Sequence, residues 1–253
     1  MQGRNRPLVV ISVLLVVLVG GLLFKAFHVK KNSDALWHII SEKCLPDMAQ
    51  HGVPAPCQQV NLAQGYVTLK DLNGPLQFLL MPVAKITGIE SPTLLVPSTP
   101  NFFALAWQQR AIMSEKRGAP VADRVIALAI NSEYGRSQNQ LHIHMSCLKP
   151  RVRQQLDQYA ASLTAQWQPF TLQKHRYLIR TLTPDQLAQE SVFIRLAQEV
   201  PQAQDQMGKY GMALAALPDG KLALLALERN WLLLNRGSPE ELQDHQCGIL
   251  QGG

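Results

Sequence analysis

The chain opens with an apolar segment unlike anything that follows it. Leu8 to Phe24 is an apolar run without a charged residue, broken only by Ser12, with Arg4 and Arg6 before it and lysines after it. At ~1.5 Å per residue, a helix of this length just spans the roughly 30 Å hydrocarbon layer of a bilayer. A cleaved signal peptide is the alternative, but the residues after the run make a poor cleavage site. The pattern predicts an uncleaved membrane anchor in residues 1–30 and a folded domain in residues 31–253.

Hydrophobic and polar positions in the folded domain predict short strands and helices in mixed order. Alternating or wholly apolar runs bounded by Gly, Pro and Asn are typical of strands, and apolar residues at helical spacing are typical of helices. No internal repeat is visible. The predicted class is therefore α+β, an antiparallel sheet with flanking helices. Hairpins are expected at 65–82 and 211–229, and single strands at 125–130, 139–148 and 177–181. Helices are expected at 102–115, with Ser98-Thr99-Pro100 as the cap, at 150–166, after Thr183 and from Ser238.

Composition and charge narrow the choice of ligands. Hydrophobic residues make up 47% of the chain and charged residues 17%, which excludes a wholly disordered protein. The formal net charge of +6 favours anionic partners, such as phosphate-bearing small molecules or an anionic lipid surface. The lysines and arginines are scattered and lack the aromatic interleaving that single-stranded nucleic acid needs. We therefore expect no nucleic-acid partner.

The four cysteines include no C-x-x-C pair. This spacing argues against a zinc site or a redox motif, and the even number suits two disulfides in an oxidising compartment. Cys44 and Cys57 bracket a proline-rich loop, and Cys147 and Cys247 would then join a central strand to the C-terminus. Four reduced core thiols are the alternative. Positive charges flank the apolar run on both sides, so the cysteines decide the expected orientation: a single-pass protein of the bacterial inner membrane whose folded domain is periplasmic.

The candidate chemistry lies in one alternating segment. On a strand, side chains alternate between faces, so His142, His144 and Ser146 share one face while the residues between them are apolar. A lone histidine is usually structural, but two at this spacing with a hydroxyl beyond them indicate a site. One interpretation is metal binding, with His175 or His245 as a third ligand. The other is attack of a neutral imidazole on phosphorus, which forms a phosphoramidate intermediate.

This segment and the residues before it resemble the signature of the histidine-triad (HIT) superfamily of nucleotide hydrolases and transferases. There an Asn and a Gln precede three alternating histidines, and the hairpin at 65–82 also resembles that superfamily. The resemblance implies a HIT-like fold in which His144 is the nucleophile and His142 orients it. The nucleotide-binding candidates are Asp71 for the ribose hydroxyls and Asn131 and Gln138 for the phosphates, together with Lys70, whose charge can neutralise them.

The sequence departs from the HIT signature in two places. Ser146 stands where the third histidine is expected, and the hairpin turn is tighter. A hydroxyl can donate a hydrogen bond to the bridging oxygen, but it is a poor general acid. Either the leaving group needs little protonation or another residue supplies the proton. Ser146 joins the two histidines as the third predicted catalytic residue.

A wider resemblance covers nearly the whole chain. The apolar run, the loop from Cys44 to Cys57, and the segments Thr99 to Phe103 and Gln243 to Cys247 resemble the CDP-diacylglycerol pyrophosphatase family of Gram-negative bacteria. This resemblance implies hydrolysis of CDP-diacylglycerol to CMP and phosphatidate in phospholipid metabolism, through a nucleotidyl-histidine intermediate. We expect no cofactor and no metal. The membrane surface is the expected second partner, and the chain can pair as a homodimer, as smaller HIT proteins do.

Three other functions fit parts of the pattern. A CMP transferase would pass the nucleotide to an acceptor other than water. A non-catalytic envelope protein would use the histidine pair to bind a metal. A lipid-binding module without turnover is the third. Product analysis, metal content and retained ligand separate these from a phosphoanhydride hydrolase.

Overall fold

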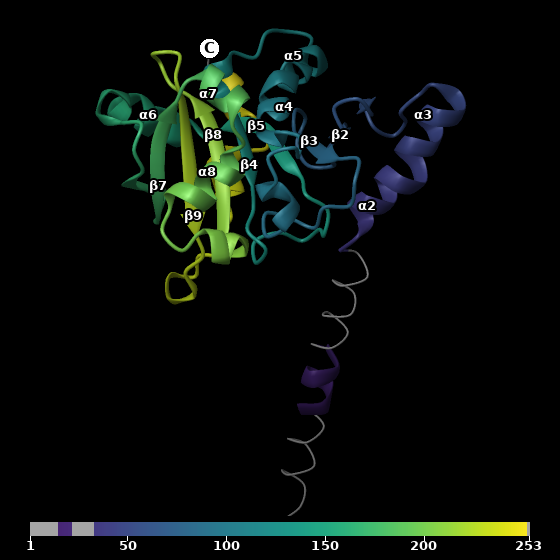
Figure 1. Cartoon of the computed structure of the whole chain (residues 1–253), viewed down its shortest axis with the longest axis horizontal. Coiled ribbons are helices and arrows are strands. Elements are labelled where there is room, and N and C mark those ends of the chain that lie inside the picture. Colours follow the sequence, from purple (N-terminus) through teal and green to yellow (C-terminus); the bar gives the residue numbers. More distant parts are fainter. Residues whose placement is uncertain (1–14, 22–32, 252–253) are drawn as a thin grey trace, which may run out of the picture.

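The computed structural model describes residues 15–21 and 33–251 and contains one large antiparallel sheet (Figure 1). Nine of its strands follow the order β1-β2-β3-β5-β4-β8-β9-β7-β6, and β10 pairs with the end of β5. The strands are β1 (Gln59–Asn61), β2 (Tyr66–Lys70), β3 (Phe78–Pro82), β4 (Ile126–Ile130), β5 (Ile143–Leu148), β6 (Gln168–Leu172), β7 (His175–Leu182), β8 (Tyr210–Ala216), β9 (Leu222–Glu228) and β10 (Gln243–Asp244).

Short helices connect the strands and cover the sheet. A π-helical turn (Ile40–Cys44) joins the first two, and several single 3-10 turns link other elements. Helix α7 begins after Thr183, as predicted, with a capping box in which Thr183 and Gln186 satisfy each other's backbone N–H groups. The helices are α2 (Ala35–Ile39), α3 (Leu45–His51), α4 (Phe102–Gln109), α5 (Ile112–Arg117), α6 (Pro150–Tyr159), α7 (Pro184–Gln189) and α8 (Val192–Glu199).

Counted outward from its centre, the sheet has the same strand order in both halves. The first half runs β4-β5-β3-β2 and the second runs β8-β9-β7-β6, with β4 paired to β8 between them. In each half the chain forms a hairpin, then two helices, then two further strands. The first half uses β2, β3, α4, α5, β4 and β5, and the second half uses β6, β7, α7, α8, β8 and β9.

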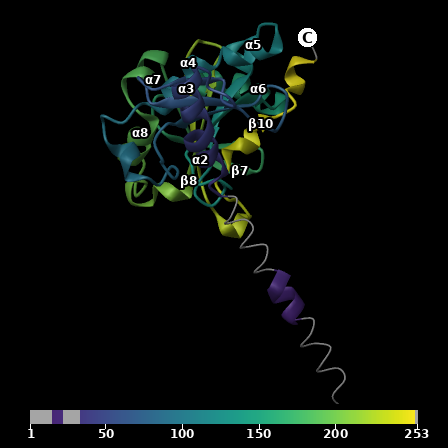
Figure 2. The same cartoon turned by 90° about the vertical axis from the view of Figure 1, so that its right-hand side faces the viewer.

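Helices cover both faces of this sheet. Helices α4 and α8 share one face, where the rings of Phe103 and Phe193 meet edge to face with centroids 5.5 Å apart. On the opposite face, α6 packs Val152 and Leu156 over the second half. Helix α2 packs over β2 and β3 of the first half, and Figure 2 looks onto α2 and α3. The centre of the sheet is therefore a rigid support for any side chain that it carries.

One row of paired residues crosses the sheet at the position of His144. The row runs through Leu79, His144, Ala129, Ala213 and Leu225, on β3, β5, β4, β8 and β9. Paired residues on neighbouring strands point to the same face. His144 and Leu225 therefore occupy equivalent places, each on the second strand from the centre and on the same face.

The predicted hairpins at 65–82 and 211–229 and the strand at 125–130 are confirmed. The helix expected at 102–115 divides into α4 and α5, because the backbone tightens where the N–H of Met113 bonds to the carbonyl of Arg110, three residues earlier. Asn101, not Ser98-Thr99-Pro100, caps α4: its side chain accepts from the N–H of Ala104. Strand β5 begins at Ile143, later than predicted, so His142 lies just before it.

The predicted membrane anchor is corrected by the structure. Within residues 15–21 and 33–251, no helix is both long and apolar enough to cross a membrane. Residues 15–21 form a short helix, and the rest of the predicted apolar run lies outside the described residues. This finding corrects the predicted N-terminal transmembrane helix and the single-pass inner-membrane localisation.

Both predicted disulfides are present. The Cα atoms of Cys44 and Cys57 lie 5.6 Å apart, and those of Cys147 and Cys247 lie 5.2 Å apart. No free cysteine occurs among the described residues. The second disulfide joins the C-terminal segment to β5, next to the histidine pair.

Candidate active site

His142 and His144 lie together on the face of the sheet that the C-terminal segment covers. Their ring centroids are 4.9 Å apart and the rings meet edge to face. The two residues are only 7% and 6% exposed. The Nδ1 atom of His142 lies 2.6 Å from the carbonyl oxygen of Gln140. Because a carbonyl can only accept, this Nδ1 donates and the lone pair of neutral His142 lies on Nε2.

The carboxamide of Gln77 connects His144 to the β2–β3 hairpin. Gln77 Nε2 donates to Oδ2 of Asp71 at 2.9 Å and lies 3.1 Å from Nδ1 of His144. The other Asp71 oxygen accepts from the backbone and side-chain nitrogens of Asn73. Asp71 therefore holds both the turn and the carboxamide that positions His144.

The segment from Ser238 to Cys247 covers the outer side of the His144 ring. Oε2 of Glu240 lies 3.5 Å from Nε2 of His144 and accepts from Nδ2 of Asn131 at 2.7 Å. Oδ1 of Asn131 accepts from Oγ of Ser238 at 2.8 Å. The structure therefore brings the predicted phosphate ligand Asn131 to the nucleophile candidate, through a carboxylate that sequence reasoning missed.

A further imidazole reaches the same carboxylate. Nε2 of His245 lies 3.2 Å from Oε1 of Glu240, so the rings of His144 and His245 face the two oxygens of one side chain. Gln243 Nε2 donates to the carbonyl oxygens of His144 at 3.1 Å and of Ala127 at 2.7 Å. These bonds fasten the C-terminal segment to the central strands.

The turn of the β2–β3 hairpin and the Cys147–Cys247 disulfide fix the position of the segment from Ser238 to Cys247. Gly74 has a φ of +65°, and a Cβ on it would lie 2.0 Å from the carbonyl oxygen of His245. Only glycine allows this approach. A cavity of about 550 Å³ adjoins the segment and is lined by Lys149, Glu240 and His245, among others. This cavity places accessible space next to the His245 imidazole.

Burial keeps both strand histidines neutral. Desolvation lowers the pKa of His144 to about 4, against the opposing effect of the Asp71 charge; the nearby His245 lowers it as well. Desolvation and His144 lower the pKa of His142 to about 4, against the hydrogen bond to Gln140. Both rings are therefore unprotonated at pH 7, the state that a nucleophilic imidazole needs.

Two predicted site residues make other contacts, and a third makes no side-chain hydrogen bond among the residues that the structure describes. Lys70 Nζ donates to two carbonyl oxygens of the hairpin turn, at 2.6 and 2.7 Å. The side-chain oxygen of Gln138 accepts from the backbone N–H of Leu36 in α2 at 3.2 Å. Ser146 is fully buried, and its hydroxyl has no hydrogen-bond partner within the described part of the chain. Roles for these residues in phosphate binding or catalysis stay predictions.

Comparison with protein families tests the resemblance that covers nearly the whole chain. The model of the family described as CDP-diacylglycerol pyrophosphatase matches residues 31–251. The chain belongs to the CDP-diacylglycerol pyrophosphatase family. Membership makes the protein a phosphoanhydride hydrolase that acts on CDP-diacylglycerol, and this confirms the predicted enzyme class and substrate. The HIT-like fold is not confirmed by this match and stays a prediction.

The family does not by itself say which residues act, and sequence reasoning missed several around His144. Gln77, Glu240 and Gln243 were not identified, and His245 was considered only as a metal ligand. One signal could have found His245: it lies two residues before Cys247, whose predicted partner Cys147 lies three residues after His144. The predicted Cys147–Cys247 disulfide alone therefore implies that His144 and His245 lie close together.

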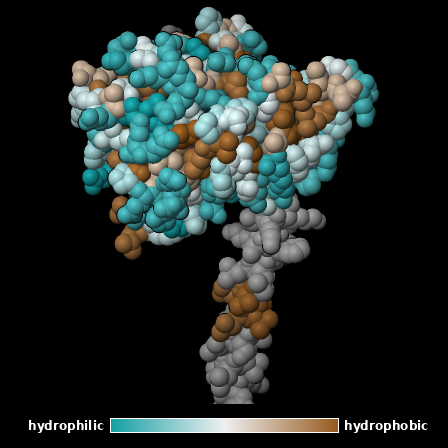
Figure 3. All heavy atoms as spheres, viewed as in Figure 1, coloured by the Kyte–Doolittle hydropathy of each residue, from teal (hydrophilic) through white to brown (hydrophobic). Residues whose placement is uncertain are grey.

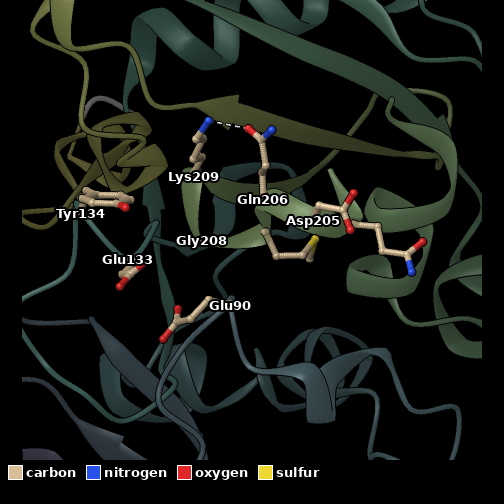
Figure 4. A pocket seen from close by; sticks show the side chains of 9 residues that line it. Glu90, Glu133, Tyr134, Asp205, Gln206, Gly208 and Lys209 are labelled. Carbon is tan, nitrogen blue, oxygen red and sulfur yellow. Dashed lines mark hydrogen bonds between the residues drawn. The ribbon is translucent and has the colours of Figure 1, made fainter. Parts of the chain in front are cut away.

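Other polar clusters are less suited to a nucleotide. No three His, Cys, Asp or Glu side chains are grouped to hold a metal in the regions that the structure describes. His175 lies apart from the histidine pair and bonds to Glu241 at 2.8 Å. Figure 4 shows a cavity of about 280 Å³ lined by Glu90, Glu133 and Asp205. The lining of this cavity contains no imidazole, so we assign the nucleotide to the histidine site.

Proposed function

We propose that this member of the CDP-diacylglycerol pyrophosphatase family releases CMP and phosphatidate through a covalent CMP–His144 intermediate. The observation that carries the proposal is the convergence of His144 Nε2, His245 Nε2 and Asn131 Nδ2 on the carboxylate of Glu240. Nitrogen atoms that surround a carboxylate in this way can also surround a phosphoryl group. The substrate phosphate then takes the place of the Glu240 carboxylate between the two rings.

Attack requires a lone pair on Nε2 of His144, and therefore a proton on its Nδ1. Gln77 Nε2 lies against this Nδ1 while it also donates to Asp71. When ribose hydroxyls bind Asp71, the carboxamide of Gln77 is free to turn its oxygen toward Nδ1 and accept the proton there. Nucleotide binding thereby sets the tautomer that the reaction needs.

The proposed reaction has two steps. In the first, the Nε2 lone pair of His144 forms a bond to the CMP phosphorus, and the bond from that phosphorus to the bridging oxygen breaks. The bridging oxygen leaves with phosphatidate and takes a proton from the imidazolium of His245. In the second step, water attacks the phosphorus, its proton returns to His245, and the N–P bond breaks to release CMP.

His245 is assigned the proton transfer because the neighbouring candidates are engaged elsewhere. Ser146 is buried, and the ammonium group of Lys70 bonds to the hairpin turn. The His245 ring is the second imidazole on the Glu240 carboxylate. In this proposal the C-terminal segment supplies the imidazole that the β5 strand lacks at Ser146.

Three finer predictions accompany the proposal. Transfer of CMP to an acceptor other than water is the alternative outcome of the same intermediate. A homodimer and contact with a membrane surface are expected from the sequence. Product analysis with and without alcohol acceptors decides between CMP alone and a CMP ester.

The first experiment compares two histidine variants with CDP-diacylglycerol as substrate. His144→Ala should lower kcat by at least about 10⁴-fold, the usual loss when a nucleophile is removed. His175→Ala is the matched control, because His175 also faces a glutamate but lies outside the site; it should keep the parent rate. An unchanged kcat in folded His144→Ala protein would refute the nucleophile assignment.

A further inference from the structure

The loop after β9 exposes four consecutive large apolar side chains. Trp231, Leu232, Leu233 and Leu234 are 51%, 96%, 63% and 88% exposed. Within residues 33–251, the other exposed large hydrophobic residues stand singly along the chain. This loop, residues 230–235, projects from the end of the sheet in Figure 1, and hydrophobic atoms stand at the corresponding place in Figure 3. A contiguous exposed apolar group of this kind marks an interaction surface.

The loop is a built structure with a defined shape. Asn230 and Asn235 pair across its base, and the Asn230 side chain accepts from the N–H of Leu233. The side chain of Asn235 donates to the carbonyl of Glu228. Leu234 has a φ of +53°, in the left-handed region that a non-glycine residue rarely adopts. The fold therefore holds the apolar side chains outward at a local cost.

Aromatic and cationic side chains flank the apolar tip. The guanidinium of Arg229 lies 3.8 Å from the ring centroid of Tyr134 and 5.1 Å from that of Trp231. Arg236 follows the tip and is exposed. Residues 228–236 carry two arginines and one glutamate. Trp and Tyr beside Leu and Arg are typical of the interface between lipid headgroups and acyl chains, where arginine also meets anionic phosphates.

The same stretch of chain leads from the tip to the histidine site. The carbonyl of Arg236 accepts from Oγ of Ser132, and the Ser238 side chain donates to Asn131. Asn131 in turn donates to Glu240, the carboxylate that faces His144. A surface that binds the tip is thus connected by a short, hydrogen-bonded segment to the residues that surround the phosphate.

We propose that loop 230–235 docks on an anionic lipid bilayer by inserting Trp231 and the three leucines into its interface. The inference rests on the proposed function in one respect: the substrate, CDP-diacylglycerol, is itself an anionic lipid of that bilayer. Burial of one leucine changes an affinity by about tenfold or more.

The direct test uses the fluorescence of Trp231 in the full-length protein. The chain has four tryptophans, and Trp231→Phe removes only the one at the tip. Vesicles of phosphatidylcholine and phosphatidylglycerol with brominated acyl chains should quench the parent protein, and Trp231→Phe should abolish the quenched component. Absent quenching in the parent, or equal quenching in the variant, overturns the proposal. This result does not depend on catalysis.

A kinetic test compares a lipid substrate with a soluble one. The double variant Leu232→Ser, Leu233→Ser should lower kcat/KM for CDP-diacylglycerol in those vesicles by on the order of tenfold or more. It should leave hydrolysis of water-soluble CDP-glycerol unchanged. Leu62→Ser, at an isolated exposed leucine, is the matched control and should affect neither substrate. Equal losses on both substrates, or a changed oligomeric state in the double variant, contradict lipid docking. Failure of the parent on both substrates contradicts the proposed function instead.

Discussion

The two halves of the sheet have the same strand order but different side chains at equivalent places. In the first half, the row across the sheet carries His144 on β5, and in the second half it carries Leu225 on β9. The next row carries buried Ser146 in the first half and Ala223 in the second. The frame is shared, but at these two equivalent positions only the first half carries polar side chains.

The difference shows that two halves with the same strand order can have different roles, one carrying site residues and the other packing the core. The second half contributes buried alanines and leucines, together with Tyr177 and Ile179, to the core under α6. Its one contribution to the site comes after β9, where the chain returns to the first half with Glu240, Gln243 and His245. The account therefore places nucleophilic chemistry in the first half and stability in the second, with the C-terminal segment as the connection.

The largest effect on stability should come from removing the disulfide that ties the C-terminal segment to β5. Replacing both Cys147 and Cys247 with Ser removes a crosslink between residues 100 apart in sequence, which the chain-entropy model values at about 4–5 kcal/mol of unfolding free energy. Activity should fall as well, because the segment with His245 is no longer tied to β5. Urea unfolding and kcat measure the two effects. Removing Cys44 and Cys57 instead should affect stability less, because the loop they close spans 13 residues.

Truncation of the equivalent residue in the second half should have the opposite signature to loss of His144. Leu225→Ala leaves a cavity in the core and should lower the unfolding free energy by about 3 kcal/mol. The folded fraction should keep the parent kcat. Leu62→Ala is the exposed control. A large loss of kcat in folded Leu225→Ala protein would show that the second half takes part in the chemistry.

The loss of kcat/KM on removing the His245 imidazole should be larger for a leaving group that needs a proton than for one that does not. His245→Gln should lower kcat/KM for CDP-diacylglycerol by about a hundredfold, the lower end for a general acid. The p-nitrophenyl ester of CMP, whose leaving group needs no proton, should be affected much less. His175→Gln serves as control. Equal losses on both substrates indicate a structural role, and a selective loss in Glu240→Gln but not His245→Gln assigns the proton to Glu240.

The pH dependence of activity and stability should show that the histidines of the first half, His142 and His144, are neutral. Because the pKa of His144 is lowered to about 4, protonation of this nucleophile should make kcat/KM fall tenfold per pH unit only below about pH 4. The unfolded chain binds more protons than the folded one between pH 4 and 6.5, so the unfolding free energy should also fall across that window as pH falls. A loss of activity on acidification with a midpoint near pH 6.5 contradicts the assignment of a buried neutral nucleophile.

The sequence predicts local features well and distant contacts poorly. The β2–β3 hairpin, β4, the histidine face and both disulfides follow from patterns within a few residues or from cysteine pairing. Strand β6 was missed because Pro169 and exposed polar residues break its alternation. Glu240 and Gln243 could not be found, because their role comes from contacts with residues about 100 positions away. The anchor was wrongly predicted from apolar length alone, and the structure offers no spanning helix in the residues it describes.

The most direct test of the account is to trap the intermediate. Substrate labelled in the CMP phosphate, mixed with the enzyme and quenched with alkali within a fraction of a turnover, should leave label on the protein. Peptide mapping should place that label on His144, and His144→Ala should carry none. Turnover by the parent enzyme without bound label, or label on His142 or another residue, contradicts a first half built around His144.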